Sequence, residues 1–419
     1  MAVTEDSRAT TGEVRQESAG APPVASTPRM SDRLLRTPRT GGLIDVVSAS
    51  VGAGHLAAAR AIATQFEEQG YPTRLWDILD LMPGSLGQLI RTTYVRQVQI
   101  APSTYRWMLR SQAGTLNWLM HQALRPIYRR VLQMAAAPPL AMISTHPLGS
   151  QALGELRARG LIDVPVVTYL TDVSVHRAWV HSSVDLHLAL HELAAEDARL
   201  AGAGHIEVVR PAVRDCVTGV RSSPRSTVAA RQALGLPQQG RLILVTGGSE
   251  GLGDLDRTAH EIATSRAGTP VVLCGRNRRL LRQCTANRSV IAFSWIDDVP
   301  LLLTAADCVV QNAGGMMSLE ALAAGVPVVT YRCIAGHGET NASVLDRAGL
   351  VPWIRSCAQL GDGISKAIAL KGRPDPWSTT LASRPSIVQA VLPPPLRRSE
   401  SAAHAGVRKP NLRRRSSPN

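Results

Sequence analysis

The sequence predicts an α/β protein built from two doubly wound domains, each a parallel sheet with helices on both faces. Short apolar runs rich in β-branched residues alternate with segments of helical periodicity, and this alternation occurs twice along the chain. A stretch rich in Ser, Pro and Gln at 221–240 separates the two series. Near-continuous apolar strands between helices are typical of parallel sheets that are buried on both faces.

The individual strands follow from the apolar runs. The first series predicts strands at 43–48, 73–78, 141–145, 164–170, 184–190 and 206–210. The second predicts them at 242–246, 271–275, 290–293, 308–311 and 328–331. A chain of 419 residues that is 44% hydrophobic can bury two cores. We therefore expect two Rossmann-like domains facing each other across a cleft. Their expected ranges are 41–220 and 241–370, with a linker at 221–240 and disordered tails at 1–40 and 371–419.

Composition narrows the class of protein. The six cysteines contain no CxxC pair, so we expect reduced thiols, most of them buried, and neither disulfides nor a cysteine metal site. No apolar run approaches the ~20 residues needed to span a bilayer, and no secretory signal is recognisable, which predicts a cytoplasmic protein. The net charge of +14 is concentrated in the C-terminal tail and in one internal segment.

That internal segment contains no acidic residue between Asp80 and Glu155, while arginines and aromatic residues recur in it. A helix at 86–98 would carry an apolar face flanked by arginines, as helices in a membrane interface do. An ordinary basic surface helix is the alternative, and no nucleic-acid partner is expected because no such motif accompanies the segment. The hypothesis is peripheral association with an anionic membrane surface at the inner face of the cell membrane. The residues expected there are Arg91, Arg96, Arg106, Trp107 and Arg110.

Three glycine-rich turns follow predicted strands, at 52–55, 246–253 and 312–315. Ligands of doubly wound domains bind beyond the carboxyl ends of the strands, where these turns lie. The first turn, GAGHLA, matches a dinucleotide-binding pattern and has Asp77 at the end of the next strand, but this match alone is weak. The second lacks the ending of an ATP-binding loop. The third precedes a helix whose first amides suit a phosphate.

Several motifs in their order resemble the monogalactosyldiacylglycerol synthase group of nucleotide-sugar glycosyltransferases and, more distantly, the lipid II-forming N-acetylglucosaminyltransferase. In the first domain they are GAGH (52–55), ISTHP (143–147) and TD (171–172). In the second they are CGRN (274–277), WIDD (295–298), NAGG (312–315) and GVP (325–327). The resemblance implies the GT-B fold and an inverting transfer of a hexose from a UDP-sugar to a lipid hydroxyl such as that of diacylglycerol. It implies no cofactor and no essential metal, the UDP-sugar being a co-substrate.

The resemblance also implies a donor site in the second domain. Main chain near Ile296 would read the uracil, and Glu320 would accept the ribose hydroxyls. The diphosphate would be faced by Gly248, Ser249, Arg276, Gly314 and Gly315. The sequence departs from the family at two places: Met317 replaces a usual threonine, and His337-Gly338 stands where a Gln-Glu or Gln-Gln pair usually touches the sugar. His337 and Asn341, four residues further on, are expected to bind the donor sugar.

The acceptor hydroxyl must lose a proton during the attack, so the first domain needs a base. His55 fits because the positive end of its helix would disfavour the imidazolium, and Asp172 is the competing or assisting base. Gly52 and Gly54 would let substrate approach, and His146, His176 and Trp179 would shape the acceptor side. His187 and His191 are four residues apart, but in a strand they would be roughly 13 Å from each other, which speaks against a shared metal.

Other activities remain open on the sequence alone. One is transfer of N-acetylglucosamine to a polyprenyl-linked or natural-product acceptor. Others are a UDP-sugar epimerase, an NAD-dependent dehydrogenase that uses the first glycine turn, and a catalytically weak UDP-sugar-binding protein that docks on membranes.

Overall fold

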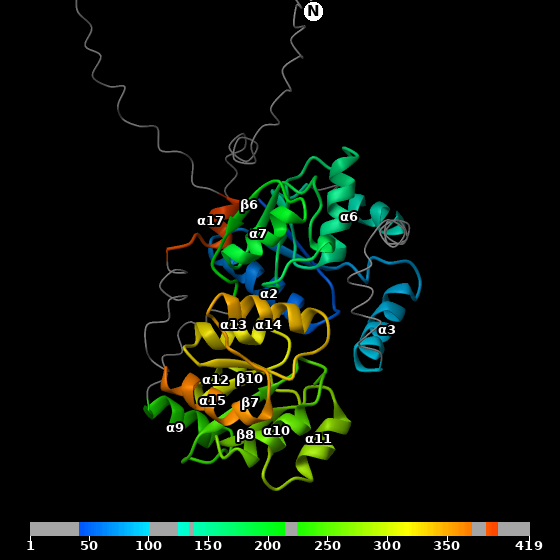
Figure 1. Cartoon of the computed structure of the whole chain (residues 1–419). Helices are drawn as coiled ribbons and strands as arrows, with labels where there is room; N and C mark the ends of the chain where they lie inside the picture. Colours follow the sequence, from blue (N-terminus) through cyan, green and yellow to red (C-terminus); the bar gives the residue numbers. More distant parts are fainter. Residues whose placement is uncertain (1–41, 101–124, 134–137, 214–223, 371–382, 393–419) are drawn as a thin grey trace, which may run out of the picture.

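The computed structural model describes residues 42–100, 125–133, 138–213, 224–370 and 383–392. They form two sheets of six parallel strands, one above the other in Figure 1. Both sheets are doubly wound, because the strand order reverses direction within each of them. The prediction of two doubly wound Rossmann-like domains is confirmed.

The first sheet has the order β2-β1-β3-β4-β5-β6. Its central strands are buried at every position and most of their residues are apolar, as in IDVVS and VVTY, which is why they stand out as apolar runs in the sequence. The strands are β1 (Ile44–Ser48), β2 (Thr73–Asp77), β3 (Ala141–Ser144), β4 (Val166–Tyr169), β5 (Leu186–Ala189) and β6 (Ile206–Val208). The helices and the 3-10 turn are α2 (Ala53–Glu68), α3 (Leu86–Ile100), α6 (Pro147–Ala158), η1 (Arg177–Trp179) and α7 (Glu192–Leu200).

The second sheet has the order β12-β11-β10-β7-β8-β9. Its strands are β7 (Leu242–Thr246), β8 (Thr269–Leu273), β9 (Ile291–Phe293), β10 (Cys308–Gln311), β11 (Val328–Tyr331) and β12 (Trp353–Ile354). Its helices and 3-10 turn are α9 (Pro224–Ala233), α10 (Leu255–Thr264), α11 (Arg278–Thr285), α12 (Val299–Ala305), α13 (Met316–Ala323), α14 (His337–Arg347), η2 (Cys357–Gln359) and α15 (Leu360–Ala369). Helix α9 occupies part of the expected linker.

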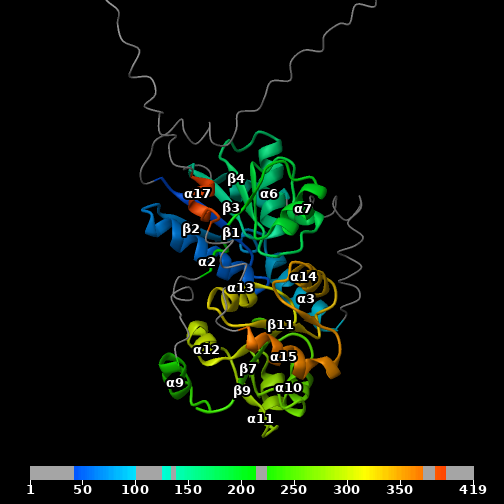
Figure 2. The same ribbon diagram turned by 60° about the vertical axis from the view of Figure 1, so that its left-hand side comes forward.

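The two domains meet where α2 of the first approaches α13 of the second, and both views show these helices side by side (Figures 1 and 2). A Cβ added at Gly54 would lie 3.5 Å from Met316 Cγ, so a larger residue at 54 would press on α13. One apolar cluster continues from the first sheet through this contact into the second. The turns that carry the predicted site residues of both domains therefore face each other.

A short helix near the C-terminus, α17 (Ile387–Val391), returns to the first domain. Ile387 and Val391 are both fully buried there, and helix α17 contacts α2. Arg210 N–H donates to the carbonyl of Pro385 at 3.0 Å, which fixes the approach of this segment. The expectation of a wholly disordered tail is therefore wrong for these residues, because their apolar side chains complete the core of the first domain.

Candidate active site between the domains

His55 lies at the start of α2, directly after the turn that Gly52 makes with a φ of 82°. Its Nδ1 is 2.9 Å from the carbonyl oxygen of Thr145 and 2.9 Å from the hydroxyl of Thr171. A carbonyl can only accept, so Nδ1 carries the proton in the neutral ring and Nε2 keeps its lone pair. The arrangement thus presents Nε2 as an acceptor, which is what a general base requires.

Aromatic rings surround His55 on the first-domain side. The ring of His146 packs edge-on at 4.7 Å and that of Trp179 lies at 5.8 Å, while His176 stacks near Trp179 at 6.3 Å. Trp179 is fully buried, yet its indole Nε1 has no acceptor among the described residues. The indole therefore packs beside His55 as part of the wall of the site. His146 has a second task, because its Nδ1 accepts the N–H of Leu148 at 3.1 Å and caps α6.

The histidines between the domains are held neutral. Burial lowers the pKa of His55, and the nearby His337 lowers it further, while Asp172 and the Thr145 carbonyl act in the opposite direction. Burial likewise lowers the pKa of His176 and His337, and it takes that of His146 well below its ordinary value. The helix end was expected to keep His55 neutral, but the first cause is the removal of water.

Asp172 and Asn341 bring the two domains into direct contact. Asn341 lies on α14 and was expected to touch the donor sugar, but its side chain is fully buried. Its Nδ2 donates to Asp172 Oδ1 at 3.2 Å, and its Oδ1 accepts from Ser174. Asp172 also acts electrostatically on both His55 and His337. The first-domain carboxylate therefore lies between histidines from both domains.

On the second-domain side, the loop after β7 and the loop after β8 are joined. The backbone N–H of Arg276 donates to the Ser249 carbonyl at 2.8 Å, and Gly248 makes the preceding turn with a φ of 76°. The guanidinium of Arg276 lies 4.5 Å from the Trp295 ring centre and pairs with Glu250 at 3.0 Å. Ile296, next to Trp295, packs partly buried against the core. These four predicted residues share one rim of the domain.

The third glycine turn leads into α13. Gly314 has a φ of 73°, and a Cβ there would lie only 2.8 Å from Asn341 Cβ. Gly315 caps the helix, and a Cβ there would meet nothing within 4 Å, so the helix start is open. Its first amides and the helix dipole suit an anion. Glu320, on α13, is 4% exposed, and its role toward the ribose stays a prediction.

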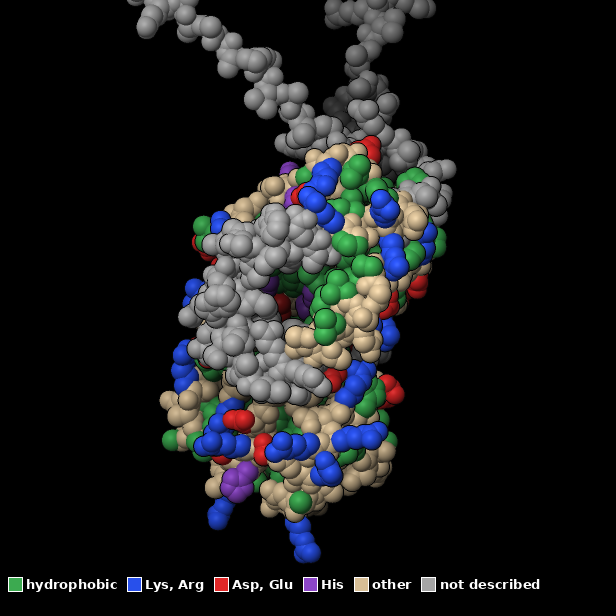
Figure 3. Space-filling model, turned by 90° about the vertical axis from the view of Figure 1, so that its right-hand side faces the viewer, with side chains coloured by type: hydrophobic (Ala, Val, Ile, Leu, Met, Phe, Trp, Pro, Cys, Tyr) green, Lys and Arg blue, Asp and Glu red, His purple; other side chains and the backbone are tan. Residues whose placement is uncertain are grey.

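Figure 3 shows a hollow between the two halves of the molecule, with histidine and acidic side chains visible inside it and apolar side chains along one border. It faces the side of the molecule on which α3 projects in Figure 1. No group of three or more His, Cys, Asp or Glu that could hold a metal occurs in the described part of the chain. His187 lies buried on β5 whereas His191 caps α7, so these two belong to different elements.

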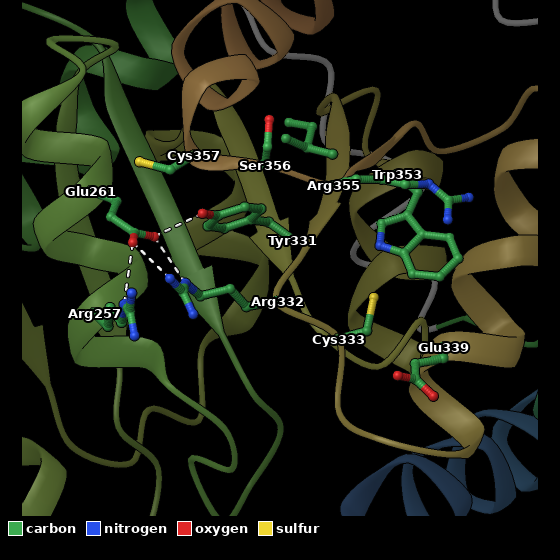
Figure 4. A pocket seen from close by; sticks show the side chains of 11 residues that line it. Arg257, Glu261, Tyr331, Arg332, Cys333, Glu339, Trp353, Arg355, Ser356 and Cys357 are labelled. Atoms are coloured by element: carbon green, nitrogen blue, oxygen red, sulfur yellow. Dashed lines mark hydrogen bonds and ion pairs between the residues drawn. The ribbon is translucent and has the colours of Figure 1, made fainter.

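A separate cavity of about 360 Å³ lies beyond β11 and β12 (Figure 4). Arg332, at a φ of 47°, pairs with Glu261 through Nη2–Oε1 at 2.6 Å and Nε–Oε2 at 2.8 Å. Tyr331 donates to the same carboxylate at 2.8 Å, and the Arg332 guanidinium holds the pKa of Glu261 at about 2. This network anchors the start of the loop that leads to His337.

The predicted membrane-facing residues are only partly described. Arg91 pairs with Asp77 at 2.9 Å and with Asp80 at 2.6 Å, so its charge is neutralised within the protein. Its place on a membrane-facing surface stays a prediction. Arg106, Trp107 and Arg110, together with the side chain of Arg96, lie outside the described residues. None of the described helices is both long and apolar enough to cross a bilayer.

Sequence reasoning missed two contributors to the site. Thr145 and Thr171 contact Nδ1 of His55 and fix its tautomer. Both lie in motifs that the sequence analysis named, but only the neighbouring residues of those motifs were given a role. Their positions directly after β3 and β4 are the signal that could have identified them, because parallel strand ends converge at one edge. The contact of Asn341 with Asp172 joins residues 169 positions apart, so no local sequence pattern could predict it.

Comparison with known proteins agrees with this geometry. Residues 55–209 match the family model for monogalactosyldiacylglycerol (MGDG) synthase, and residues 255–377 match that for glycosyl transferases group 1. The chain is 26% identical over 356 residues to the chloroplastic monogalactosyldiacylglycerol synthase of Spinacia oleracea, covering 77% of this chain and 65% of that protein. It is 23% identical over 334 residues to a processive diacylglycerol beta-glucosyltransferase of Bacillus cereus, covering 75% of this chain and 82% of that protein.

Among solved structures, Anabaena HepE in complex with UDP-glucose has the same fold. The TM-score is 0.51 at 15% identity, covering 84% of this chain and 97% of that chain. The two facing Rossmann-like domains and this likeness show that the chain has the GT-B fold. The match of residues 55–209 to the MGDG synthase model and the similarity to the spinach enzyme agree with the resemblance found in the sequence.

Proposed function

We propose that the protein is an inverting hexosyltransferase that moves a sugar from a UDP-sugar to the hydroxyl of a diacylglycerol. The observation that carries the proposal is the His55 ring, whose Nε2 is left as an acceptor by the Thr145 contact. It lies where the first domain meets the donor-type turns of the second. The names of the spinach and Bacillus relatives support diacylglycerol as the acceptor class.

In this mechanism His55 Nε2 takes the proton of the acceptor hydroxyl as its oxygen attacks the anomeric carbon. The bond from that carbon to the UDP oxygen breaks, and negative charge develops on the diphosphate. The open start of α13 at Gly315 and the Arg276 guanidinium are the groups proposed to stabilise that charge. Because the amides and the stacked arginine are already oriented, little reorganisation is needed during the reaction.

His55 is the preferred base over Asp172. The carboxylate of Asp172 accepts a hydrogen bond from Asn341, whereas the ring of His55 is held neutral by burial. Asp172 then has a supporting task, because a carboxylate near His55 stabilises the imidazolium that forms in the transition state. No metal step is part of this proposal, and the UDP-sugar serves as co-substrate.

Access to a lipid acceptor requires the protein to meet a bilayer. We place the membrane-facing side on the face with the hollow, from which α3 projects. Leu89, on α3, is 60% exposed. Peripheral association with the inner face of the cell membrane follows from this proposal. Flotation with vesicles containing anionic lipid tests it, using Leu89→Asp as the variant and Leu200→Asp, an exposed leucine on α7, as the control.

A donor panel tests the proposed reaction. The full chain is incubated with UDP-glucose, UDP-galactose or UDP-N-acetylglucosamine and vesicles containing diacylglycerol, and the lipid fraction is analysed by mass spectrometry. The proposal expects a hexosyl-diacylglycerol from at least one donor. Transfer only to a polyprenyl-linked acceptor, or UDP binding with no product on diacylglycerol, would contradict it.

A further inference from the structure

Asn341 makes four hydrogen bonds, three of which connect the second domain to the first. Its Oδ1 accepts from the backbone N–H of Ser174 at 3.0 Å and from the Ser174 hydroxyl at 2.6 Å. Its Nδ2 donates to Asp172 Oδ1 at 3.2 Å and to the Ala313 carbonyl at 3.0 Å. Asn341 thus links the loop after β4 in the first domain to the glycine turn before α13 in the second.

The orientation of this carboxamide is determined by its partners. A backbone N–H can only donate, so the atom facing Ser174 must be the oxygen. A carbonyl and a carboxylate can only accept, so the atom facing Ala313 and Asp172 must be the nitrogen. A primary amide has two donor hydrogens and two acceptor lone pairs, and all four are used here. With no exposed surface and no spare hydrogen bond, Asn341 has nothing to offer a sugar hydroxyl.

The surrounding residues are fitted to this contact. Gly314 leaves room for Asn341, since a Cβ at 314 would lie 2.8 Å from Asn341 Cβ. His337 is four residues earlier on α14, so it occupies the same face of the helix as Asn341. Asp172 raises the pKa of His337 and also that of His55, both of which burial lowers. The carboxylate held by Asn341 therefore lies within electrostatic reach of a histidine from each domain.

We propose that Asn341 is a positioning residue, which orients the Asp172 carboxylate beside His55 and fastens the acceptor-side loop to α14 of the donor domain. The catalytic consequence of this inference rests on the proposed function, whereas the positioning of the loop and the carboxylate by Asn341 does not depend on it. In this arrangement the Asp172 carboxylate is aligned only when the two domains are in contact. The hydrogen bond from Asn341 therefore joins the domains and places Asp172 beside the proposed base, His55.

Three variants test the proposal. Asn341→Leu removes all four bonds, Asn341→Asp keeps the acceptor oxygens but faces Asp172 with a second carboxylate, and Ser174→Ala removes only the hydroxyl contact. The matched control is Asp307→Asn, which weakens the Arg231 pair (2.7 Å) just before β10, at the amino end of the strands and so away from the cleft at their carboxyl ends. It lowers stability without touching the cleft. Hydrogen exchange of the Ser174 amide, kcat and KM for the UDP-hexose, and the pH–rate profile are measured for each.

For Asn341→Leu we expect faster exchange at Ser174 and a loss of about 100-fold in kcat, the cost of a misplaced catalytic group. KM for the UDP-hexose stays near that of the parent. Ser174→Ala is expected to lose about threefold to tenfold in kcat, as for a single hydrogen bond. In Asn341→Asp the acidic limb of the profile moves to higher pH, because two carboxylates in contact, near His55, His176 and His337, hold a shared proton more tightly.

Two results would overturn the proposal. One is a large rise in KM for the UDP-hexose with kcat preserved in the Asn341 variants, which is the signature of a direct sugar contact. The other is unchanged exchange at Ser174 in Asn341→Leu, which would show that the carboxamide does not hold the loop. If Asn341→Leu does not fold, Ser174→Ala and Asn341→Asp decide by the same readouts. Faster Ser174 exchange in a protein without transferase activity would support the positioning while rejecting the proposed function.

Discussion

Replacement of His187 by leucine should make the protein more resistant to acid. His187 lies on β5 with no exposed surface, and its ring contacts the backbone of His205 without a hydrogen bond of normal geometry. Burial lowers its pKa to about 4, from 6.5 in the unfolded chain. A group with a lowered folded pKa favours the folded state above the unfolded pKa, and this contribution is lost as the pH falls toward the folded value.

The size of the effect follows from these two values. Between about pH 7.5 and about pH 5, His187 becomes protonated in the unfolded chain but stays neutral in the folded protein. That difference removes about 2 kcal/mol from the free energy of unfolding. Leucine has a similar volume and no titrating group, so His187→Leu should escape this loss. Its stability at neutral pH should be at least that of the parent, since no satisfied hydrogen bond is removed.

Urea titrations at both pH values measure the difference, with hydrogen exchange of the peptide around β5 reporting on the first domain. The exposed neighbour His205 provides the control, because His205→Gln leaves the buried ring in place. The reasoning is refuted if the parent and His187→Leu lose the same stability between the two pH values. Other buried histidines contribute to the acid lability of both proteins and cancel in this comparison.

Three further predictions concern the site and the fold. His55→Gln should lower kcat by about 10²–10⁴-fold, while the affinity for UDP measured by calorimetry is retained. In the parent, the acidic limb of the pH–rate profile should lie below pH 6.5, because burial lowers the pKa of His55. An unchanged kcat in His55→Gln would exclude His55 as the base. Val391→Ala should destabilise the first domain by about 2 kcal/mol in urea unfolding, since this α17 side chain is fully buried, whereas no change would mean that α17 does not pack there. Activity should persist in excess EDTA, and a loss restored by one divalent ion would contradict the metal-free proposal.

Most of the fold was predictable because buried parallel strands leave an unmistakable pattern. The runs at 242–246 and 308–311 became β7 and β10 with the same bounds. Helix α17 was not predicted, because five residues in a basic, Pro-rich tail are too short to show a helical period. An isolated helix of this length is not stable, so its structure depends on packing against the first domain.

The site was predictable in its members more than in their relations. His55 and Asp172 stood in recognisable motifs, but the neutrality of His55 comes chiefly from burial, which depends on residues far away in the sequence that pack around the ring. Arg91 appeared unpaired because no acidic residue follows it for many positions. In the structure it pairs with Asp77 and Asp80, which precede it in the sequence. Charge partners and interdomain contacts are set by tertiary packing, so sequence spacing does not reveal them.

The most direct test of the account is the anomeric configuration of the lipid product. The full chain is supplied with the α-linked UDP-hexose selected by the donor panel and with diacylglycerol vesicles, and the glycolipid is examined by NMR. A single displacement with His55 as base predicts a β-glycosyl-diacylglycerol that His55→Gln fails to form at the parent's rate. An α-glycoside, or hexose released into water with no glycolipid, would contradict the central claim.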